Sequence, residues 1–234
     1  MVSKLGPWVP HKLTEKQRIA RVNIAASLLT RQHAEDFLDR VITGDEKWIL
    51  YEDNKRKRQW VDADESGKPT PKNDLHPKKV LLSIWWDKGG VVYWELLPTN
   101  QTIISEVYSA QLNRLNEELQ KKRPALVNRK GVILQHDNAR PHVAKTTLEK
   151  LKELKWEALI HPPYSPDLAP TDFHLFLSLS NFLRGKKFGS LEPLKMALGS
   201  FFDSKSVGFY SSGIYKLTAR WEDVIKKDGE YIED

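Results

Sequence analysis

The stretch VLLSIWWDKGGVVYWELL, residues 80–97, decides the fold class of this chain. Two runs of aliphatic and aromatic residues, 80–86 and 91–97, flank the tetrapeptide DKGG, and paired glycines suit a tight turn between antiparallel strands. The stretch therefore predicts a β-hairpin, and the segments on either side of it must supply the rest of a sheet.

The chain before the hairpin has the pattern of a helix followed by a strand. Thr14 is followed three residues later by Gln17, which is a capping-box pattern, so we expect a helix over residues 14–36. Its apolar stripe consists of Ile19, Val22, Ala26 and Leu29. In a strand over residues 41–51 side chains alternate between the two faces, which puts Asp45 in mid-strand. A carboxylate there needs a partner or a function.

Beyond the hairpin the pattern is mostly helical. Residues 105–123 predict an amphipathic helix, because their apolar side chains recur at spacings of four, three and four. These side chains are Tyr108, Leu112, Leu115 and Leu119. Strands at 131–136 and 156–160 enclose a helix at 143–154, which makes a β-α-β unit. After a proline-rich segment at 161–170, we expect helices at 171–183, 191–203 and 213–226.

The order of these elements is that of the ribonuclease H-like fold. It is an α/β arrangement in which a five-stranded mixed sheet, with three antiparallel and two parallel strands, is flanked by helices. Residues 52–79, between the first strand and the hairpin, are polar and basic apart from a possible short strand at 59–61. We therefore expect a long insertion there, and loops of this length are usually functional or disordered.

Composition limits the possible functions. The 37 Lys and Arg residues outnumber the 31 Asp and Glu residues, which gives a net charge of +6 and suggests a polyanionic partner. The absence of cysteine excludes disulfides, zinc–thiolate sites and thiol nucleophiles. No signal-peptide pattern and no run of about 18 apolar residues occurs, so we expect no membrane partner.

Three aspartates are candidates for chemistry. If the first and fourth strands are neighbours, Asp45 approaches Asp137 at the carboxyl end of the fourth strand, and Asp172 can reach the same point from the following helix. Three carboxylates without counter-charge repel one another, and a divalent cation resolves the repulsion. Hard oxygen ligands suit Mg²⁺ or Mn²⁺. Two such ions about 3.5 to 4 Å apart can activate the attacking oxygen and stabilise the leaving oxygen at a phosphodiester.

Each acid also has an ordinary explanation, and these alternatives stay open at this point. Asp45 can pair with Lys47 or Arg40. Asp137 can turn the chain before Asn138 or cap a helix, and Asp172 can be a first-turn acid favoured by the helix dipole. Asp167 is a rival third ligand, although its proline-rich turn explains it equally well. The tryptophans are expected in the core; they include Trp48, on the face opposite Asp45, as well as Trp85, Trp86, Trp94, Trp156 and Trp221.

Other kinds of site have weaker support. His136, His142, His161 and His174 cluster near the acids and make a zinc site an alternative, but no two of them form a ligand pair on one helix face. A serine-hydrolase elbow of the Gly-x-Ser-x-Gly type is absent. A glycine-rich loop that would cradle phosphate is absent as well.

Four motifs, taken together, resemble a known family. They are WVPHKL (residues 8–13), TGDEKW (43–48), HDNARPH (136–142) and YSPDLAP (164–170), the last followed by Asp172. In this order they resemble the catalytic domain of mariner-family DNA transposases over residues 2–231. Between Asp137 and Asp172 lie 34 residues, the spacing of the family's catalytic acids.

The resemblance implies a cut-and-paste transposase. Such an enzyme hydrolyses a phosphodiester at a transposon end and then transfers the freed 3′-hydroxyl into target DNA at a TA dinucleotide. By analogy Asp45 bridges two Mg²⁺ or Mn²⁺ ions, and Asp137 and Asp172 each hold one. Two other functions remain as alternatives: a transposon-derived DNA-binding or scaffold protein without cleavage, and a ribonuclease H-like nuclease that acts on RNA–DNA hybrids.

The resemblance also implies the domain plan and the DNA contacts. Residues 1–13 correspond to an interdomain linker, 14–234 to the catalytic domain, and 52–78 to a clamp loop that reaches the partner subunit of a homodimer. The implied DNA contacts are Trp8, His11, Lys55, Arg56, Lys57, Arg58, Arg140 and His142. For His142, capping of the following helix is an equal alternative.

Two further expectations follow from the resemblance. Because only seven residues precede Trp8, we expect the family's helix-turn-helix domains to be absent, which leaves mostly salt-sensitive DNA affinity. The DNA substrate implies a nuclear location. An aspartate at position 172, where an asparagine would weaken metal binding, favours activity.

Overall fold

A computed structural model describes residues 11–52, 62, 64, 66, 77–98 and 101–232. Its five-stranded mixed sheet has the order β3-β2-β1-β4-β5, as the sequence predicts for a ribonuclease H-like fold. The strands are β1 (Val41–Leu50), β2 (Lys79–Asp87), β3 (Gly90–Leu96), β4 (Ile133–Gln135) and β5 (Glu157–Ala158). The predicted insertion at 52–78, with Lys55 to Arg58, lies almost wholly outside the described residues, as does Trp8.

The pairing of the strands confirms both the hairpin and the β-α-β unit. β2 pairs antiparallel with β1 and with β3, and Gly90 follows the hairpin turn with a φ of 123°, a conformation that favours glycine. β4 pairs parallel with β1 on one side and with β5 on the other. The first and fourth strands are therefore neighbours, as the expected approach of Asp45 and Asp137 requires.

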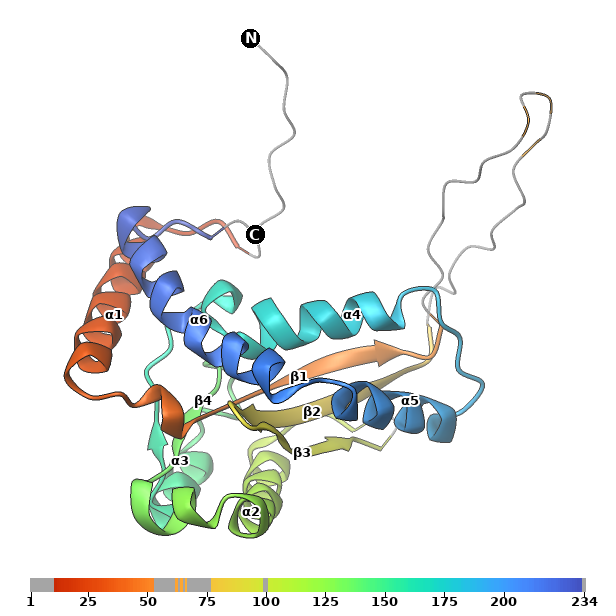
Figure 1. The fold of residues 1–234 in the computed structure, drawn as a ribbon, viewed down its shortest axis with the longest axis horizontal. Helices are drawn as coiled ribbons and strands as arrows, with labels where there is room; N and C mark the ends of the chain where they lie inside the picture. Colours follow the sequence, from red (N-terminus) through yellow and green to blue (C-terminus); the bar gives the residue numbers. More distant parts are fainter. Residues whose placement is uncertain are drawn as a thin grey trace.

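Helices cover both faces of the sheet, as Figure 1 shows. They are α1 (Glu15–Ala34), α2 (Ser105–Lys122), α3 (Lys145–Leu154), α4 (Leu177–Leu183), α5 (Leu191–Asp203) and α6 (Val207–Lys226). In Figure 1, α2 and α3 lie below the sheet and α4 lies above it. The buried side chains of α5 and α6 share one core with those of α4, and α1 lies beside α6. The capping box of α1 is present, because the Thr14 hydroxyl accepts from the Gln17 backbone and the Gln17 side chain accepts from the Thr14 backbone. No helix in the described ranges is long and apolar enough to cross a bilayer.

Short helical turns connect these elements. They are the 3-10 helices η1 (Leu38–Arg40) and η3 (Pro166–Leu168) and the π-helices η2 (Leu126–Lys130) and η4 (Thr171–Phe176). The predicted α-helix at 171–183 therefore begins as a π-helix, a wider turn that is frequent at functional sites. The last helix also begins earlier than the sequence pattern indicated, because Ser206 caps it through the backbone N–H of Phe209.

The sheet separates two hydrophobic cores. Trp85 and the predicted stripe of α2 belong to the core beneath the sheet, and Trp86 and Trp221 belong to the larger core above it. Trp156 is buried and Trp94 packs against the larger core, so the expectation for these five tryptophans is confirmed.

Two core predictions are wrong. Trp48 is 43% exposed, and the Nζ atom of Lys79 lies 4.4 Å from the centroid of its ring. In α1 the buried side chains are Arg21, Ala25 and Leu28. Ile19, which was assigned to the apolar stripe, is exposed instead.

Candidate active site

Asp45 and Asp172 meet above the sheet. Asp45 lies in the middle of β1, and Asp172 lies in the first turn of η4, where its backbone N–H donates to the carbonyl oxygen of Ala169 at 2.9 Å. The two carboxyl groups lie close enough to shift each other's pKa. Among the described residues, Asp45 forms no ion pair with Lys47 or Arg40, so the ordinary explanation for its position does not hold.

A buried polar network beneath this pair fixes the elements that carry it. The hydroxyl of Thr43 donates to the Gln135 side chain and lies 3.1 Å from the Thr171 hydroxyl. The indole Nε1–H of Trp86 also donates to Thr171, at 3.1 Å. Thr43, Gln135 and Thr171 each lie one or two residues before a candidate aspartate, so this network sets the relative position of β1, β4 and η4.

The two paired carboxyl groups cannot both carry a full charge. Burial is the largest cause that raises the pKa of Asp45 well above its usual value, and the charges of Asp172, Glu46 and Asp137 raise it further. Burial also raises the pKa of Asp172 to about 6, although the hydrogen bond from Asp45 and the charge of Lys47 oppose the shift. Repulsion of this kind is relieved by a shared proton or by a divalent cation.

Asp137 lies at the carboxyl end of β4, and two donors hold it. Its Oδ1 atom accepts from the Ala139 backbone N–H at 2.9 Å and from His142 Nδ1 at 2.6 Å. Burial alone would raise the pKa of Asp137, but these hydrogen bonds and the charge of His142 outweigh it and hold the pKa below its usual value. The bond from Ala139 is the chain-turning role that the sequence left open, and Asp137 also borders the same cavity as Asp172.

That cavity of about 360 Å³ lies between the aspartates and the proline-rich corner. Its lining includes Asp137, Asn138, His161, Tyr164 and Asp172. In this corner Tyr164 adopts a left-handed backbone conformation with a φ of 55°, which is uncommon for a residue other than glycine.

Asp167 is engaged elsewhere and is not a third ligand. Both of its carboxylate oxygens accept from the guanidinium of Arg21, at 2.9 and 2.6 Å, and the backbone N–H of Ile232 donates to it as well. Arg21 also donates to the Ser165 hydroxyl at 2.6 Å. The pair therefore anchors the corner to α1.

The histidines do not form a zinc site. His136 bonds to the Tyr108 hydroxyl, His161 to Gln135, and His174 to the Phe209 carbonyl, so their partners differ. In the described part of the chain, no three His, Cys, Asp or Glu side chains converge closely enough to hold a metal ion unaided.

The carboxylates nevertheless suit a hard cation. Asp45 and Asp172 supply oxygen ligands that interact with each other, and Asp137 adds a third carboxylate in the wall of the cavity that Asp172 also lines. Oxygen donors of this kind are those that Mg²⁺ and Mn²⁺ prefer. The chemistry of the donor set thus fits the ion that the sequence predicted, although the three groups are not already assembled around a point.

The other described residues that were predicted to contact DNA do not lie together in the structure. Arg140 is exposed on the loop that follows Asp137, and His11 stacks on the ring of Tyr164 with a centroid distance of 4.1 Å. His142 is only 2% exposed and does not cap α3, whose N-cap residue Ala144 has no side-chain capping bond. Both ring nitrogens of His142 face carboxylates, since Nε2 lies 3.3 Å from Glu46 Oε2.

Several residues that shape the site were not identified from the sequence. Glu46 and Thr43 belong to the same motif as Asp45, and Thr171 directly precedes Asp172, so proximity in the motif was an available signal. Arg21 and Tyr108 gave no such signal. Tyr108 was assigned to the apolar stripe of its helix and Arg21 was not singled out, and only the tertiary structure brings them to the site.

Comparison with known proteins gives the family. A family model described as transposase (partial DDE domain) matches residues 50–129. The chain is 49% identical over 232 residues to the human histone-lysine N-methyltransferase SETMAR, which covers 99% of this chain and 34% of that protein. It is 43% identical over 233 residues to the mariner Mos1 transposase of Drosophila mauritiana, which covers 99% of this chain and 68% of that one.

Solved structures agree with this. The Mos1 transposase in a paired-end complex with the left transposon end matches with a TM-score of 0.94 and 43% identity, over 100% of this chain and 68% of that one. The catalytic domain of the same transposase matches with a TM-score of 0.84 and 41% identity, over 97% of this chain and 100% of that one. This chain thus spans about a third of the human relative and about two thirds of the Mos1 transposase. It belongs to the mariner family of transposases.

Proposed function

We propose that this chain is the catalytic domain of a cut-and-paste DNA transposase. The observation that carries the proposal is the half-buried pair of Asp45 and Asp172, with Asp137 on the wall of the cavity that Asp172 lines. Burial of two adjacent carboxyl groups is costly, and folded proteins keep such arrangements mainly where they serve chemistry. The identity to the Mos1 transposase supports the reaction class.

The three aspartates would hold two Mg²⁺ or Mn²⁺ ions, with Asp45 shared between them. Structures of the Mos1 transposase include paired-end complexes with Mn and with Mg, which supports the choice of ion. Bound divalent ions supply positive charge that activates an attacking oxygen and stabilises a leaving oxygen. The chain's own contribution would be to fix the three carboxylates on β1, β4 and η4.

The substrate would be double-stranded DNA. The reaction begins with hydrolysis of a phosphodiester at a transposon end, and the freed 3′-hydroxyl then attacks target DNA at a TA step. Arg140, which is exposed on the loop after Asp137, would contact a phosphate of this DNA, and the other contacts proposed are Trp8, His11 and Lys55 to Arg58. Structures of the Mos1 transposase in paired-end and strand-transfer complexes support a homodimeric assembly on DNA. A nuclear location follows from this substrate.

A nicking assay tests the proposal. Supercoiled plasmid that carries transposon ends is incubated with the protein and Mg²⁺ or Mn²⁺, and the nicked product is measured over time. We expect metal-dependent nicking that Asp172→Ala abolishes while DNA binding persists. Asp203→Ala, which removes an exposed acid at the end of α5, is the matched control and should nick at the parent rate.

The same assay separates the competing functions. Absence of metal-dependent nicking by the parent protein would favour a DNA-binding scaffold. Degradation of an RNA–DNA hybrid with no action on duplex DNA would favour a ribonuclease H-like nuclease and contradict the transposase proposal.

A further inference from the structure

We propose that His142, held in place by Glu46, is a positioning residue that orients the Asp137 carboxylate. This inference rests on the proposed function, because it takes Asp137 to be a metal ligand. The Nδ1 atom of His142 lies 2.6 Å from Oδ1 of Asp137, and the Ala139 backbone N–H donates to the same oxygen at 2.9 Å. Within the described part of the chain no donor engages Oδ2, so that oxygen stays available to a cation.

Two neighbouring aromatic rings restrict the rotation of the His142 ring. It packs against the ring of Tyr108 with centroids 4.1 Å apart and against His136 at 5.1 Å, with the His136 and His142 planes inclined by 8°. Tyr108 and His136 are themselves joined, because the Tyr108 hydroxyl lies 2.8 Å from His136 Nδ1. All three side chains are buried.

Glu46 holds the other edge of the imidazole. Its Oε2 atom lies 3.3 Å from Nε2 of His142, and its side chain is 14% exposed. Glu46 follows Asp45 on β1, and adjacent strand residues point to opposite faces of a sheet. Asp45 therefore approaches the proposed metal site from above the sheet, whereas Glu46 acts from below through His142. Both strand neighbours contribute to the same cluster of carboxylates.

Contacts of this kind have a known effect on metal ligands. A side chain that bonds to one oxygen of a ligating carboxylate fixes its orientation, and loss of such a partner typically weakens metal binding by about 10- to 100-fold. His142 has no access to substrate at 2% exposure, so its influence on the reaction passes through Asp137.

Two substitutions at His142 test the contacts of its two ring nitrogens separately. The amide nitrogen of asparagine lies where Nδ1 of histidine lies, so His142→Asn keeps the donor to Asp137 and loses the contact with Glu46. The amide nitrogen of glutamine lies closer to the position of Nε2, so His142→Gln keeps the contact with Glu46 and loses the donor to Asp137. The variants have similar polarity, and a role in packing alone would affect both alike.

Mn²⁺ alone is the probe, and its affinity for the full chain is measured by electron paramagnetic resonance and calorimetry, together with thermal unfolding. We expect His142→Gln to bind Mn²⁺ about 10- to 100-fold more weakly than the parent, and His142→Asn to stay within about threefold of it. Glu46→Gln should fall between the two. Equal Mn²⁺ affinity in the Gln and Asn variants, whether both are weakened or both unchanged, would overturn the positioning role.

A control distinguishes failure of this inference from failure of the proposed function. Asp137→Asn should weaken Mn²⁺ binding at least as much as His142→Gln. If the parent protein binds no Mn²⁺, the metal part of the proposed function is contradicted, and crystal structures of the two His142 variants then test the positioning itself. If the Asp137 carboxylate rotates in the Gln variant but not in the Asn variant, the inference is supported. If the carboxylate is unchanged in both variants, the inference is overturned.

Discussion

The guanidinium of Arg21 is completely buried and forms a bidentate ion pair with the carboxylate of Asp167, with N–O distances of 2.9 and 2.6 Å. Arg21 lies in the middle of α1, and Asp167 lies in the proline-rich corner that leads to Asp172. Further bonds from Arg21 to the carbonyl oxygens of Gly229 and Glu230 connect the same point to the end of the chain. One side chain thus joins three segments that are distant in sequence.

Loss of this pair should destabilise the fold strongly. Arg21→Ala leaves the largely buried Asp167 carboxylate without its partner, and breaking one side of a buried ion pair costs about 3–5 kcal/mol. Urea unfolding should show a decrease of this size in the free energy of unfolding. Arg18→Ala is the matched control from the same helix: its pair with Glu230 is exposed, so the loss should stay below about 1 kcal/mol. Similar losses in both variants would contradict the role given to Arg21.

The Thr171 hydroxyl should matter to stability and to the site together. Thr171→Val removes a group that accepts from Trp86 and contacts Thr43, which leaves buried polar atoms without a partner at a cost of about 1–3 kcal/mol. Since Thr171 precedes Asp172, nicking should slow by about tenfold or more as the carboxylate shifts. Thr30→Val removes an exposed hydroxyl that bonds within α1, and it should change neither property. Parent-like nicking by Thr171→Val would contradict this account of the network.

Much of the fold could be predicted because local patterns agree with tertiary packing. The hairpin glycines, the capping box at Thr14 and the apolar stripe of α2 each have a local physical cause, and each is present. The neighbouring positions of β1 and β4, on which the expected approach of Asp45 and Asp137 depends, could also be predicted from the order of elements.

The errors arise where tertiary contacts, which no local pattern contains, decide the environment of a side chain. Alternation along a strand gives the face of a side chain but not how far the covering helices extend, so Trp48 was assigned to the core although it is exposed. The stripe of α1 was misplaced because apolar residues were assumed to face inward, whereas the buried face includes the charged Arg21. The bond between His142 and Glu46 depends on two elements meeting in space, which no spacing in the sequence encodes.

Close packing of α6 against the sheet gives a prediction at Gly213. A Cβ atom there would lie 2.5 Å from Cδ2 of His174 and 2.8 Å from Cη2 of Trp86, so Gly213→Ala should cost about 1–3 kcal/mol through overpacking. Gly208, in the same helix, has open surroundings with its nearest contact at 3.7 Å. Gly208→Ala should therefore be neutral or stabilise by up to about 1 kcal/mol, because alanine favours helix. Thermal unfolding of both variants decides the matter, and a loss of stability at Gly208 alone would reverse the assignment.

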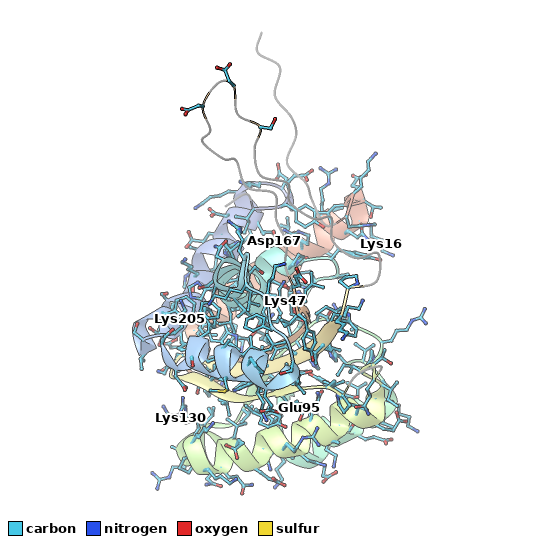
Figure 2. All side chains as sticks on the ribbon, turned by 90° about the vertical axis from the view of Figure 1, so that its right-hand side faces the viewer. Lys16, Lys47, Glu95, Lys130, Asp167 and Lys205 are labelled. Atoms are coloured by element: carbon cyan, nitrogen blue, oxygen red, sulfur yellow. The ribbon has the colours of Figure 1, made fainter. Side chains whose placement is uncertain are left out.

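Acid should weaken the contact between β3 and α2 through Glu95, which Figure 2 shows between the sheet and α2. Burial opposes the charge of Glu95, but hydrogen bonds from Arg114, Tyr93 and Gln111 outweigh it, so the pKa of Glu95 is lower in the folded chain than its usual 4.5. A carboxyl group with a lowered folded pKa stabilises the fold at pH values above its unfolded pKa, and this contribution is lost as the pH falls through the folded pKa.

Glu95→Gln tests this directly. The variant should unfold more readily than the parent at pH 7, since it lacks the charge that Arg114 engages at 2.9 Å. As the pH falls below about 4.5, the parent should lose its advantage and the urea midpoints should converge. Glu118→Gln is the control, because that carboxylate lies on the surface with Lys121, and salt screens such pairs. A difference between parent and Glu95→Gln that stays constant from pH 7 to pH 3 would show that packing, rather than the charge of Glu95, stabilises this contact.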